Sequence, residues 1–389
     1  MGAITKPSAR AIRPRYVHAK IPYRAEPGVL PAGYQMIHSI EIKNFKGFKN
    51  FKVDHCNRVN VIVGDNGVGK TALLEAIFLA LSATPEKAIV LRQWRGLDGA
   101  FGGAPQTIED ALYGDLFSAA DTQAPVEIIL NGDGAETRSL KISKGQSETR
   151  IPVGGNGTRE AEVTSSTIFE WTDFKGDKKV SRTKISSAGI QFEHSGVGKS
   201  DCYFFPAAAP VPSIEAAARF SALSTAGQTG DLIRSFKSIF SWLDDLSIET
   251  IGALPAVHAS VRGFKRKIPL TAVSGAINRI VAIAVAIAHQ KNGVVLVDEV
   301  ENGVYYSRQA SMIRLLLETA RQNDCQLFLS SHSGEWLSSL TSAAGKDVGD
   351  ISLWRLEHDK NWNVEMFQFG GQSLKAGIAQ GVEVRGGDE

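Results

Sequence analysis

A glycine-rich segment carries the residues best suited to chemistry. It reads Gly-Asp-Asn-Gly-Val-Gly-Lys-Thr over residues 64–71 and fits the phosphate-binding pattern G-x-x-x-x-G-K-[ST]. Such a loop places backbone N–H groups around an anion, and a helix beginning there adds about half a positive charge. Lys70 would reach the β- and γ-phosphates, and the Thr71 hydroxyl would hold Mg²⁺. The sequence therefore predicts an ATP·Mg²⁺ site formed by Gly64, Asp65, Asn66, Gly67, Val68, Gly69, Lys70 and Thr71.

The elements on either side of this loop fit the prediction. Residues 59–63 form a short apolar run typical of a buried strand, and residues 71–81 have the strongly apolar face of a packed helix. A strand that ends, a glycine-rich turn and a helix that begins are the context this motif requires. We therefore prefer nucleotide binding to a glycine-rich turn without a ligand.

A second segment places two acids at the end of a strand. Four apolar residues, 294–297, precede Asp298 and Glu299, as in a central parallel strand buried on both faces. Ligands of open α/β sheets bind at the carboxyl ends of such strands. Asp298 would hold Mg²⁺ directly or through water, and Glu299 would orient and deprotonate the attacking water. The alternative is a solvated acidic turn.

Two further polar segments lie near these motifs in the chain. Strand-like residues 326–329 lead into Ser-Ser-His-Ser, which would bring His332 beside Asp298 and onto the γ-phosphate if the two strands are neighbours. A structural histidine is the alternative. Ser274 and Gly275 precede an Ala-rich helix and fit a helix start with exposed N–H donors.

The composition is that of an ordinary globular protein. The 389 residues are 43% hydrophobic and 22% charged with a net charge of +2, which provides little attraction to nucleic acid. The longest apolar run, residues 280–288, is far too short to span a bilayer, and no secretory signal is evident. The three widely spaced cysteines make no metal-ligand pattern and favour a reducing, cytoplasmic setting.

The patterning divides the chain into four parts. The proline-rich, basic residues 1–35 predict a flexible or partner-bound extension, with a transit peptide as the alternative. We expect a first ATPase lobe over 36–205, a helical insertion over 206–275 and a second lobe over 276–389. Within these parts, residues 82–124 look like an irregular insertion over the site, and residues 125–205 are predicted to be β structure. Residues 213–252 are predicted to be helical, and residues 351–356 and 364–369 to form a closing hairpin.

One segment resembles a second phosphate loop. Residues 196–200 read Gly-Val-Gly-Lys-Ser, but Glu193 stands where the first glycine belongs. The residues that follow, 201–205, continue as a strand rather than a helix. We interpret this segment as a turn.

The motifs and their order resemble those of a known group. The opening Asn-Phe-Lys-Gly-Phe, the phosphate loop, Ser-Gly before a long helix, Asp-Glu-Val-Glu-Asn-Gly and Ser-Ser-His-Ser occur in that sequence. The chain is similar to ABC-type ATPases of the RecF/SMC/OLD group, and in particular to stand-alone ATPases of prokaryotic anti-phage defence such as the PARIS ATPase subunit. The resemblance covers roughly residues 36–82 and 250–340.

The resemblance implies an α/β P-loop NTPase with an ABC-type head: a mixed central sheet, an antiparallel β lobe and a helical insertion. Two heads would enclose two ATP molecules, with Lys70 in Walker A, Asp298 and Glu299 in Walker B, and His332 as the switch histidine. Ser274 and Gly275 would form the signature motif that contacts the partner's γ-phosphate. By position, Asn302 and Gly303 would form the D-loop, and the Q-loop glutamine would be Gln93 or Gln191. Lys46 matches a basic residue that some relatives place near the phosphates, but we prefer to interpret it as a surface lysine.

The sequence departs from the group at three points. The signature has Ala276 in place of a second glycine, and Val304 and Tyr305 stand where relatives often carry Leu-His. Roughly fifty-five residues follow His332, without an acidic cluster typical of the TOPRIM nuclease of OLD proteins. Any nuclease activity is therefore expected from a separate effector protein.

Two functions follow as hypotheses. The first is a self-associating sensor ATPase that controls a separate effector, such as a nuclease, in anti-phage defence. The alternative is a RecF-like ATPase that binds DNA ends or acts in repair. Two basic clusters could bind DNA: Lys43, Lys46, Lys49 and Lys52, and Arg262, Lys265, Arg266 and Lys267. The alternative is that they are solvated strand edges and loops. A transporter subunit fits the motifs poorly, and no membrane partner is expected.

Overall fold

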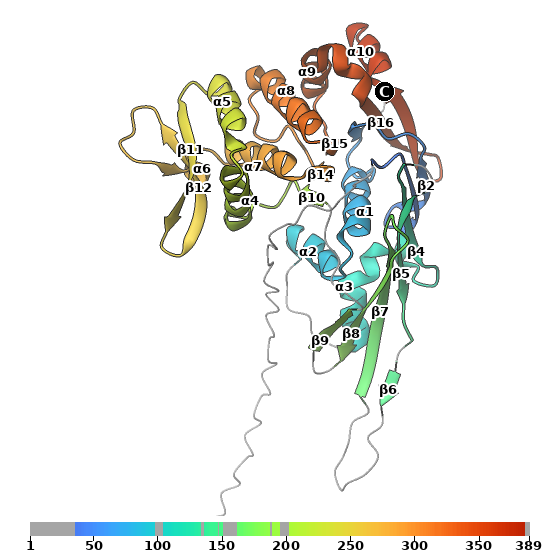
Figure 1. The fold of residues 1–389 in the computed structure, drawn as a ribbon. Coiled ribbons are helices and arrows are strands. Elements are labelled where there is room, and N and C mark those ends of the chain that lie inside the picture. The colour runs from blue at the N-terminus through green and yellow to red at the C-terminus, as the bar shows by residue number, and fades with distance from the viewer. Residues whose placement is uncertain are drawn as a thin grey trace, which may run out of the picture.

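The computed structural model describes residues 36–97, 104–133, 136–146, 148–150, 162–186, 189–194 and 202–385. The extension 1–35 and the loop-like segment 196–200 lie outside these residues. Three sheets and their helices form the described part of the chain (Figure 1).

A six-stranded mixed sheet lies at the centre. Its order is β10-β14-β15-β3-β16-β17, with the first five strands parallel and β17 antiparallel to β16. The strands are β3 (Val59–Gly64), β10 (Cys202–Phe205), β14 (Val294–Val297), β15 (Gln326–Ser330), β16 (Ile351–His358) and β17 (Val364–Gly370). The predicted closing hairpin is confirmed, and its first strand joins the central sheet beside β3.

The region 125–205 is β structure in its described part, as predicted; all of its strands except β10 join β1 and β2 in an eight-stranded antiparallel sheet. Its order is β2-β1-β4-β5-β7-β8-β9, and β6 pairs with β7. Its strands are β1 (Ser39–Phe45), β2 (Phe48–Val53), β4 (Val126–Asn131), β5 (Thr137–Lys144), β6 (Glu148–Arg150), β7 (Glu162–Thr172), β8 (Lys178–Ser186) and β9 (Gly189–His194). Buried and exposed residues alternate along β4 and β5, as expected where one face packs on the core.

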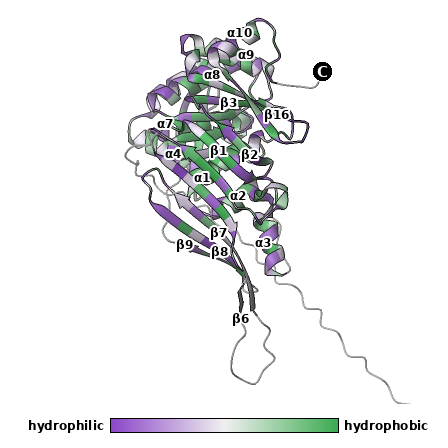
Figure 2. Cartoon of the chain, turned by 90° about the vertical axis from the view of Figure 1, so that its right-hand side faces the viewer, coloured by the Kyte–Doolittle hydropathy of each residue, from purple (hydrophilic) through white to green (hydrophobic). Residues whose placement is uncertain are grey.

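Helix α1 (Lys70–Ser82) joins the two large sheets. Almost all of its residues are buried, and one hydrophobic cluster combines them with side chains of both sheets. Figure 2 shows hydrophobic colour concentrated in the elements at the centre of the molecule. The helix that follows the loop is therefore held between the two large sheets.

Residues 82–124 contain helices in their described part, so the prediction of an irregular segment is wrong there. Helix α2 (Glu86–Trp94) contacts α1, whereas α3 (Pro105–Tyr113) packs on β7 and β8 of the antiparallel sheet; two short 3₁₀ turns follow. Gly96 follows the end of α2, and Pro105 occupies the first turn of α3, where its missing N–H costs nothing. Gly96 therefore marks the end of one helix, and Pro105 marks the start of the next.

The segment 206–275 is only partly helical. After α4 (Ser213–Thr225) and α5 (Thr229–Ile239), the chain forms a three-stranded sheet instead of the helix expected as far as residue 252. Its strands are β11 (Leu243–Ile251), β12 (Leu254–Val261) and β13 (Ile268–Pro269). Apolar and polar residues alternate from Leu246 onward, which suits a strand, and Gly252 turns the hairpin with a φ of 64°. Figure 1 shows this small sheet standing apart from the two larger ones.

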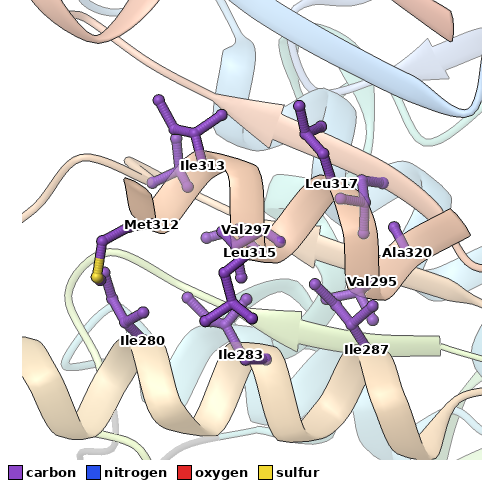
Figure 3. Packing of buried hydrophobic residues seen from close by; sticks show 14 of the residues in the cluster. Ile280, Ile283, Ile287, Val295, Val297, Met312, Ile313, Leu315, Leu317 and Ala320 are labelled. Carbon is purple, nitrogen blue, oxygen red and sulfur yellow. The ribbon is translucent and has the colours of Figure 1, made fainter. Parts of the chain in front are cut away.

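The remaining helices cover the central sheet. After the short α6 (Leu270–Val273) come α7 (Gly275–His289), α8 (Tyr306–Gln322), α9 (Gly334–Ala344) and α10 (Gly371–Ala379). Ile280, Ile283 and Ile287 recur on one face of α7 and lie against Val295 and Val297 of β14 (Figure 3). No helix among the described residues is both long and apolar enough to cross a membrane.

Candidate ATP-binding and hydrolysis site

The phosphate loop connects the end of β3 to the start of α1, as the sequence predicts. Gly64, Gly67 and Gly69 have φ values of 142°, 81° and 109°, which side chains rarely adopt. A Cβ on Gly64 would lie 2.3 Å from the carbonyl oxygen of Leu356 on the neighbouring strand β16. The loop geometry therefore requires glycine at this position.

The start of α1 has free donors for an anion. Its cap, Gly69, has no side chain to accept from the first-turn N–H groups. The ammonium group of Lys70 donates to the carbonyl oxygens of Gly64 at 2.7 Å and Asp65 at 2.8 Å, so it lies folded back into the loop. Burial lowers the pKa of Lys70 from its ordinary value, while nearby carboxylates, Asp298 foremost, oppose this shift. The Lys70 side chain thus places a cation within the amide-lined loop.

Thr71 and Asp298 bring the two halves of the site together. The Thr71 hydroxyl donates to Asp298 Oδ2 at 2.9 Å, and the Ser330 hydroxyl donates to Asp298 Oδ1 at 2.6 Å. Asp298 follows β14, Ser330 ends β15, and these two strands are adjacent and parallel. The condition on which the expected position of His332 depends, that these two strands are neighbours, is therefore met.

Glu299 and His332 lie side by side at this edge. His332 Nε2 is 3.8 Å from Glu299 Oε1, and Asn302 Nδ2 donates to Glu299 Oε2 at 2.6 Å. Glu299 has a φ of 48°, an uncommon value for a residue with a side chain, and its N–H donates to Ser330 Oγ at 2.8 Å. Both side chains remain about one-third exposed, at 37% and 36%, so a ligand can reach them.

Ser274 and Gly275 lie at the start of α7, as predicted. The Ser274 hydroxyl accepts from the N–H of Ile277 at 3.3 Å, which caps the helix. Within the described part of the chain, no hydrogen bond connects these two residues to the phosphate loop. A Cβ on Gly303 would lie 2.5 Å from the Cβ of Ala276, so Ala276 packs directly against the turn after the acidic strand.

Three residues at the site were missed by the sequence analysis. Ser330 is fully buried and connects Asp298 with the backbone of Glu299. Glu301 accepts from the N–H of His332 at 2.6 Å. Arg279 donates to three carbonyl oxygens: Phe205 at 3.2 Å, Pro206 at 2.7 Å and Asp298 at 2.7 Å. Their only sequence signal is position. Ser330 lies within Ser-Ser-His-Ser, Glu301 lies within Asp-Glu-Val-Glu, and Arg279 follows Ser-Gly by four residues.

Burial lowers the pKa of the Arg279 guanidinium, and the charges of Asp298 and Glu299 partly offset this effect. The guanidinium therefore interacts with the acidic strand end through both its hydrogen bond and its charge.

The remaining sequence candidates lie elsewhere. Lys46 is not a surface lysine, because its side chain is 11% exposed and pairs with the buried carboxylate of Glu75 on α1. Gln93 belongs to α2, and Gln191 is exposed on β9. None of the three hydrogen-bonds to the phosphate loop in the described structure.

The oxygen donors at the site suit a hard cation. A threonine hydroxyl and a carboxylate 2.9 Å apart are ligand types that Mg²⁺ accepts when phosphate and water complete its shell. Among the described residues, no group of three or more His, Cys, Asp or Glu side chains could hold a metal ion by itself.

Comparisons with known proteins agree with this geometry. The model of a family described as "AAA domain" matches residues 39–205, and that of "AAA domain, putative AbiEii toxin, Type IV TA system" matches residues 204–337. An "ATP/GTP phosphatase" of Helicobacter pylori is 25% identical over 364 residues, which cover 86% of this chain and 96% of the relative.

Two further matches are a short sequence match and a solved structure. A "DNA replication and repair protein RecF" of Oenococcus oeni is 46% identical over 43 residues, 11% of this chain and 12% of that protein. Among solved structures, an SMC head bound to the C-terminal winged-helix domain of ScpA has a TM-score of 0.46 at 13% identity. That comparison covers 86% of this chain and 98% of the other.

Proposed function

This chain is a P-loop ATPase of the AAA/ABC type, and we propose that it acts as a nucleotide-driven switch in which two copies close around two ATP molecules. The hydrogen bond between Thr71 and Asp298 is the observation that most directly supports an ATP site in this chain. It unites the phosphate loop with the acidic strand end, so one triphosphate can contact both. The fold corresponds to the ABC-type head that the sequence indicates.

The roles of the side chains follow from their positions. The loop amides and Lys70 bind the β- and γ-phosphates, and Thr71 with Asp298 holds Mg²⁺. Bound Mg²⁺ would neutralise charge on the phosphate oxygens. Glu299 orients and deprotonates the attacking water, and His332 contacts the γ-phosphate from the next strand.

We assign Ser274 and Gly275 to the partner's site. Gly275 is exposed at the start of α7, where first-turn N–H groups can donate, whereas the N–H of Ser274 donates to the carbonyl oxygen of Leu270. Neither residue hydrogen-bonds to the loop of its own chain among the described residues. A second head that supplies these donors would complete the site, which makes closure of the pair dependent on ATP.

The test uses Glu299→Gln, which keeps the shape of the site but removes the base. ATP should then bind, turn over ~10²–10⁴-fold more slowly, and hold the protein as a dimer measurable by light scattering. Glu365→Gln, on exposed β17, is the control. Turnover at the unaltered rate in Glu299→Gln would remove Glu299 as the base.

A second experiment addresses the shared site. Lys70→Ala and Ser274→Arg should each be inactive alone, because the first loses phosphate binding and the second blocks the contact to the partner. Mixing them allows heterodimers in which one of the two sites has both intact halves, so each heterodimer should turn over ATP at up to about half the rate of an unaltered dimer. Two variants that remain inactive at every mixing ratio would argue against composite sites.

For the biological role we propose control of a separate effector in anti-phage defence, in the cytoplasm. The family description for residues 204–337 mentions a toxin–antitoxin system, which supports this class of role. The native protein and Glu299→Gln should each be purified with and without ATP, followed by mass spectrometry of the proteins retained. A nuclease or other toxin retained in only one nucleotide state supports the proposal, and the absence of any nucleotide-dependent partner contradicts it.

DNA-end binding is a second candidate, favoured by one surface. The loop between β12 and β13 has four basic residues around Phe264, whose side chain is 62% exposed. Arg262 and Lys267 pair with acids of β11, whereas Lys265 and Arg266 have no ion pair among the described residues. DNA-stimulated ATP turnover that falls steeply with salt, and is lost in a Lys265→Ala/Arg266→Ala variant but not in Lys360→Ala, would favour this role.

A further inference from the structure

Glu301 lies two residues beyond the proposed base and beneath the loop that carries His332. Its Oε1 accepts a hydrogen bond from the backbone N–H of His332 at 2.6 Å. Its Oε2 is buried and has no hydrogen-bond partner among the residues that the structure describes. A buried carboxylate oxygen without a partner costs free energy. This cost calls for an explanation, and the hydrogen bond from the other oxygen to His332 provides one.

The peptide of His332 is also held from the opposite side. Its carbonyl oxygen accepts from Arg385 Nη1 at 3.3 Å, and Arg385 belongs to the segment after α10. His332 lies between the end of β15 at Ser330 and the start of α9 at Gly334, so neither element fixes its backbone directly. Side chains from two other segments therefore set the position of this residue.

The imidazole ring has little to orient it by itself. Among the described residues the ring makes no hydrogen bond, and its ion-pair contact is with Glu299 Oε1 at 3.8 Å, which is longer than a hydrogen bond. The ring therefore depends on its backbone for its place beside Glu299. A rotation of the peptide at His332 would move the ring away from the proposed γ-phosphate position.

We propose that Glu301 is a positioning residue for catalysis: its hydrogen bond to the N–H of His332 holds the imidazole beside Glu299. The inference rests on the proposed function, in which His332 contacts the γ-phosphate. It also links the turn after β14 with the loop after β15, so a movement of one is passed to the other.

The test is a double-mutant cycle on ATP turnover in the full-length protein. Glu301→Ala should lower kcat about tenfold and change KM less than about twofold, because the nucleotide contacts of the phosphate loop remain. Glu301→Gln keeps an oxygen that can accept from His332 N–H and should stay within about threefold of the unaltered protein. Glu318→Gln, on the exposed face of α8, should have no effect.

The decisive measurement places Glu301→Ala in a His332→Ala background. Because Glu301 acts through the imidazole, the double variant should turn over ATP at the rate of His332→Ala alone. If the two losses multiply, Glu301 acts independently, for example as a ligand of water or metal through Oε2, and the proposal is wrong. If Glu301→Ala does not fold, Glu301→Asp, which is too short to reach the N–H, takes its place in the cycle.

Other outcomes separate this inference from the function on which it rests. An unaltered protein without ATP turnover, or a His332→Ala variant at full rate, would contradict the proposed function itself. A slow His332→Ala variant together with an unaffected Glu301→Ala variant would overturn only the role of Glu301.

Discussion

The Thr71 hydroxyl and the Asp298 carboxylate, 227 residues apart in the sequence, are joined by a hydrogen bond of 2.9 Å. Thr71 lies at the start of α1, after the loop that follows β3, and Asp298 follows β14; β15 lies between these two strands. The contact is possible because the loop after β3 and the residue after β14 lie at the same edge of the parallel strands. It makes the nucleotide-binding and hydrolytic halves of the site one unit.

Replacing Lys70 should weaken nucleotide binding. Its ammonium group is the cation within the phosphate loop, and a hydrogen bond to a charged group contributes about 1.5–3 kcal/mol. Lys70→Ala should therefore lower the affinity for ATP roughly tenfold to a hundredfold, measured by calorimetry. Lys375→Ala, exposed on α10, is the control. Equal affinities in the two variants would show that Lys70 does not contact the phosphates.

Replacing Asp298 should change the dependence on magnesium. Asp298→Asn keeps the size of the side chain but loses the charge that would attract the ion. We expect the Mg²⁺ concentration needed for half-maximal turnover to rise about tenfold or more, while ATP binding measured in EDTA stays the same. An unchanged Mg²⁺ requirement would mean that the metal is held elsewhere.

Ser330 should matter for stability as well as activity. Its buried hydroxyl donates to Asp298 and accepts from the N–H of Glu299, so Ser330→Ala removes the partner of one buried and one partly buried polar group. The cost should be about 1–3 kcal/mol in the free energy of unfolding, measured by urea denaturation. Ser338→Ala, whose exposed hydroxyl bonds its own helix, should cost much less. Equal losses in the two variants would argue against a special role for Ser330.

A substitution of Gly64 should damage the fold around the loop. Alanine there would place its Cβ 2.3 Å from the carbonyl oxygen of Leu356, at a φ of 142°. Either β3 and β16 must separate or the loop must rearrange, so Gly64→Ala should lower the melting temperature and abolish ATP binding. Gly349→Ala, where a Cβ would have nothing within 4 Å, is the matched control. A Gly64→Ala variant that melts and binds ATP normally would contradict this account.

The sequence predicted the elements whose signals are local. The glycine pattern of residues 64–71 and the apolar run before Asp298 identified their strand and helix neighbours correctly, since each depends on adjacent residues alone. The roles assigned to these side chains remain predictions. The pairing of β16 with β3 could not be predicted, because strand order depends on contacts between distant parts of the chain.

The errors also have physical causes. Gly96, Gly99, Gly102 and Gly103 suggested an irregular segment, but Gly96 follows a helix end and the last three lie outside the described residues. Apolar side chains of residues 236–243 suggested a continuing helix, whereas the hairpin turn at Gly252 pairs the following residues as strands. Ser330 and Glu301 could not be assigned from sequence, because their partners come from another strand or loop.

Arg279 has a further consequence for communication within one protomer. It lies on the helix that follows Ser274, and its guanidinium donates to the peptide oxygens of Pro206, just after β10, and Asp298, just after β14. In the proposed pair of heads, a partner that pulls on the start of α7 would act through Arg279 on the residue before the proposed base. Each copy would then sense, at its own acidic strand end, whether the start of its α7 is engaged by the neighbouring molecule.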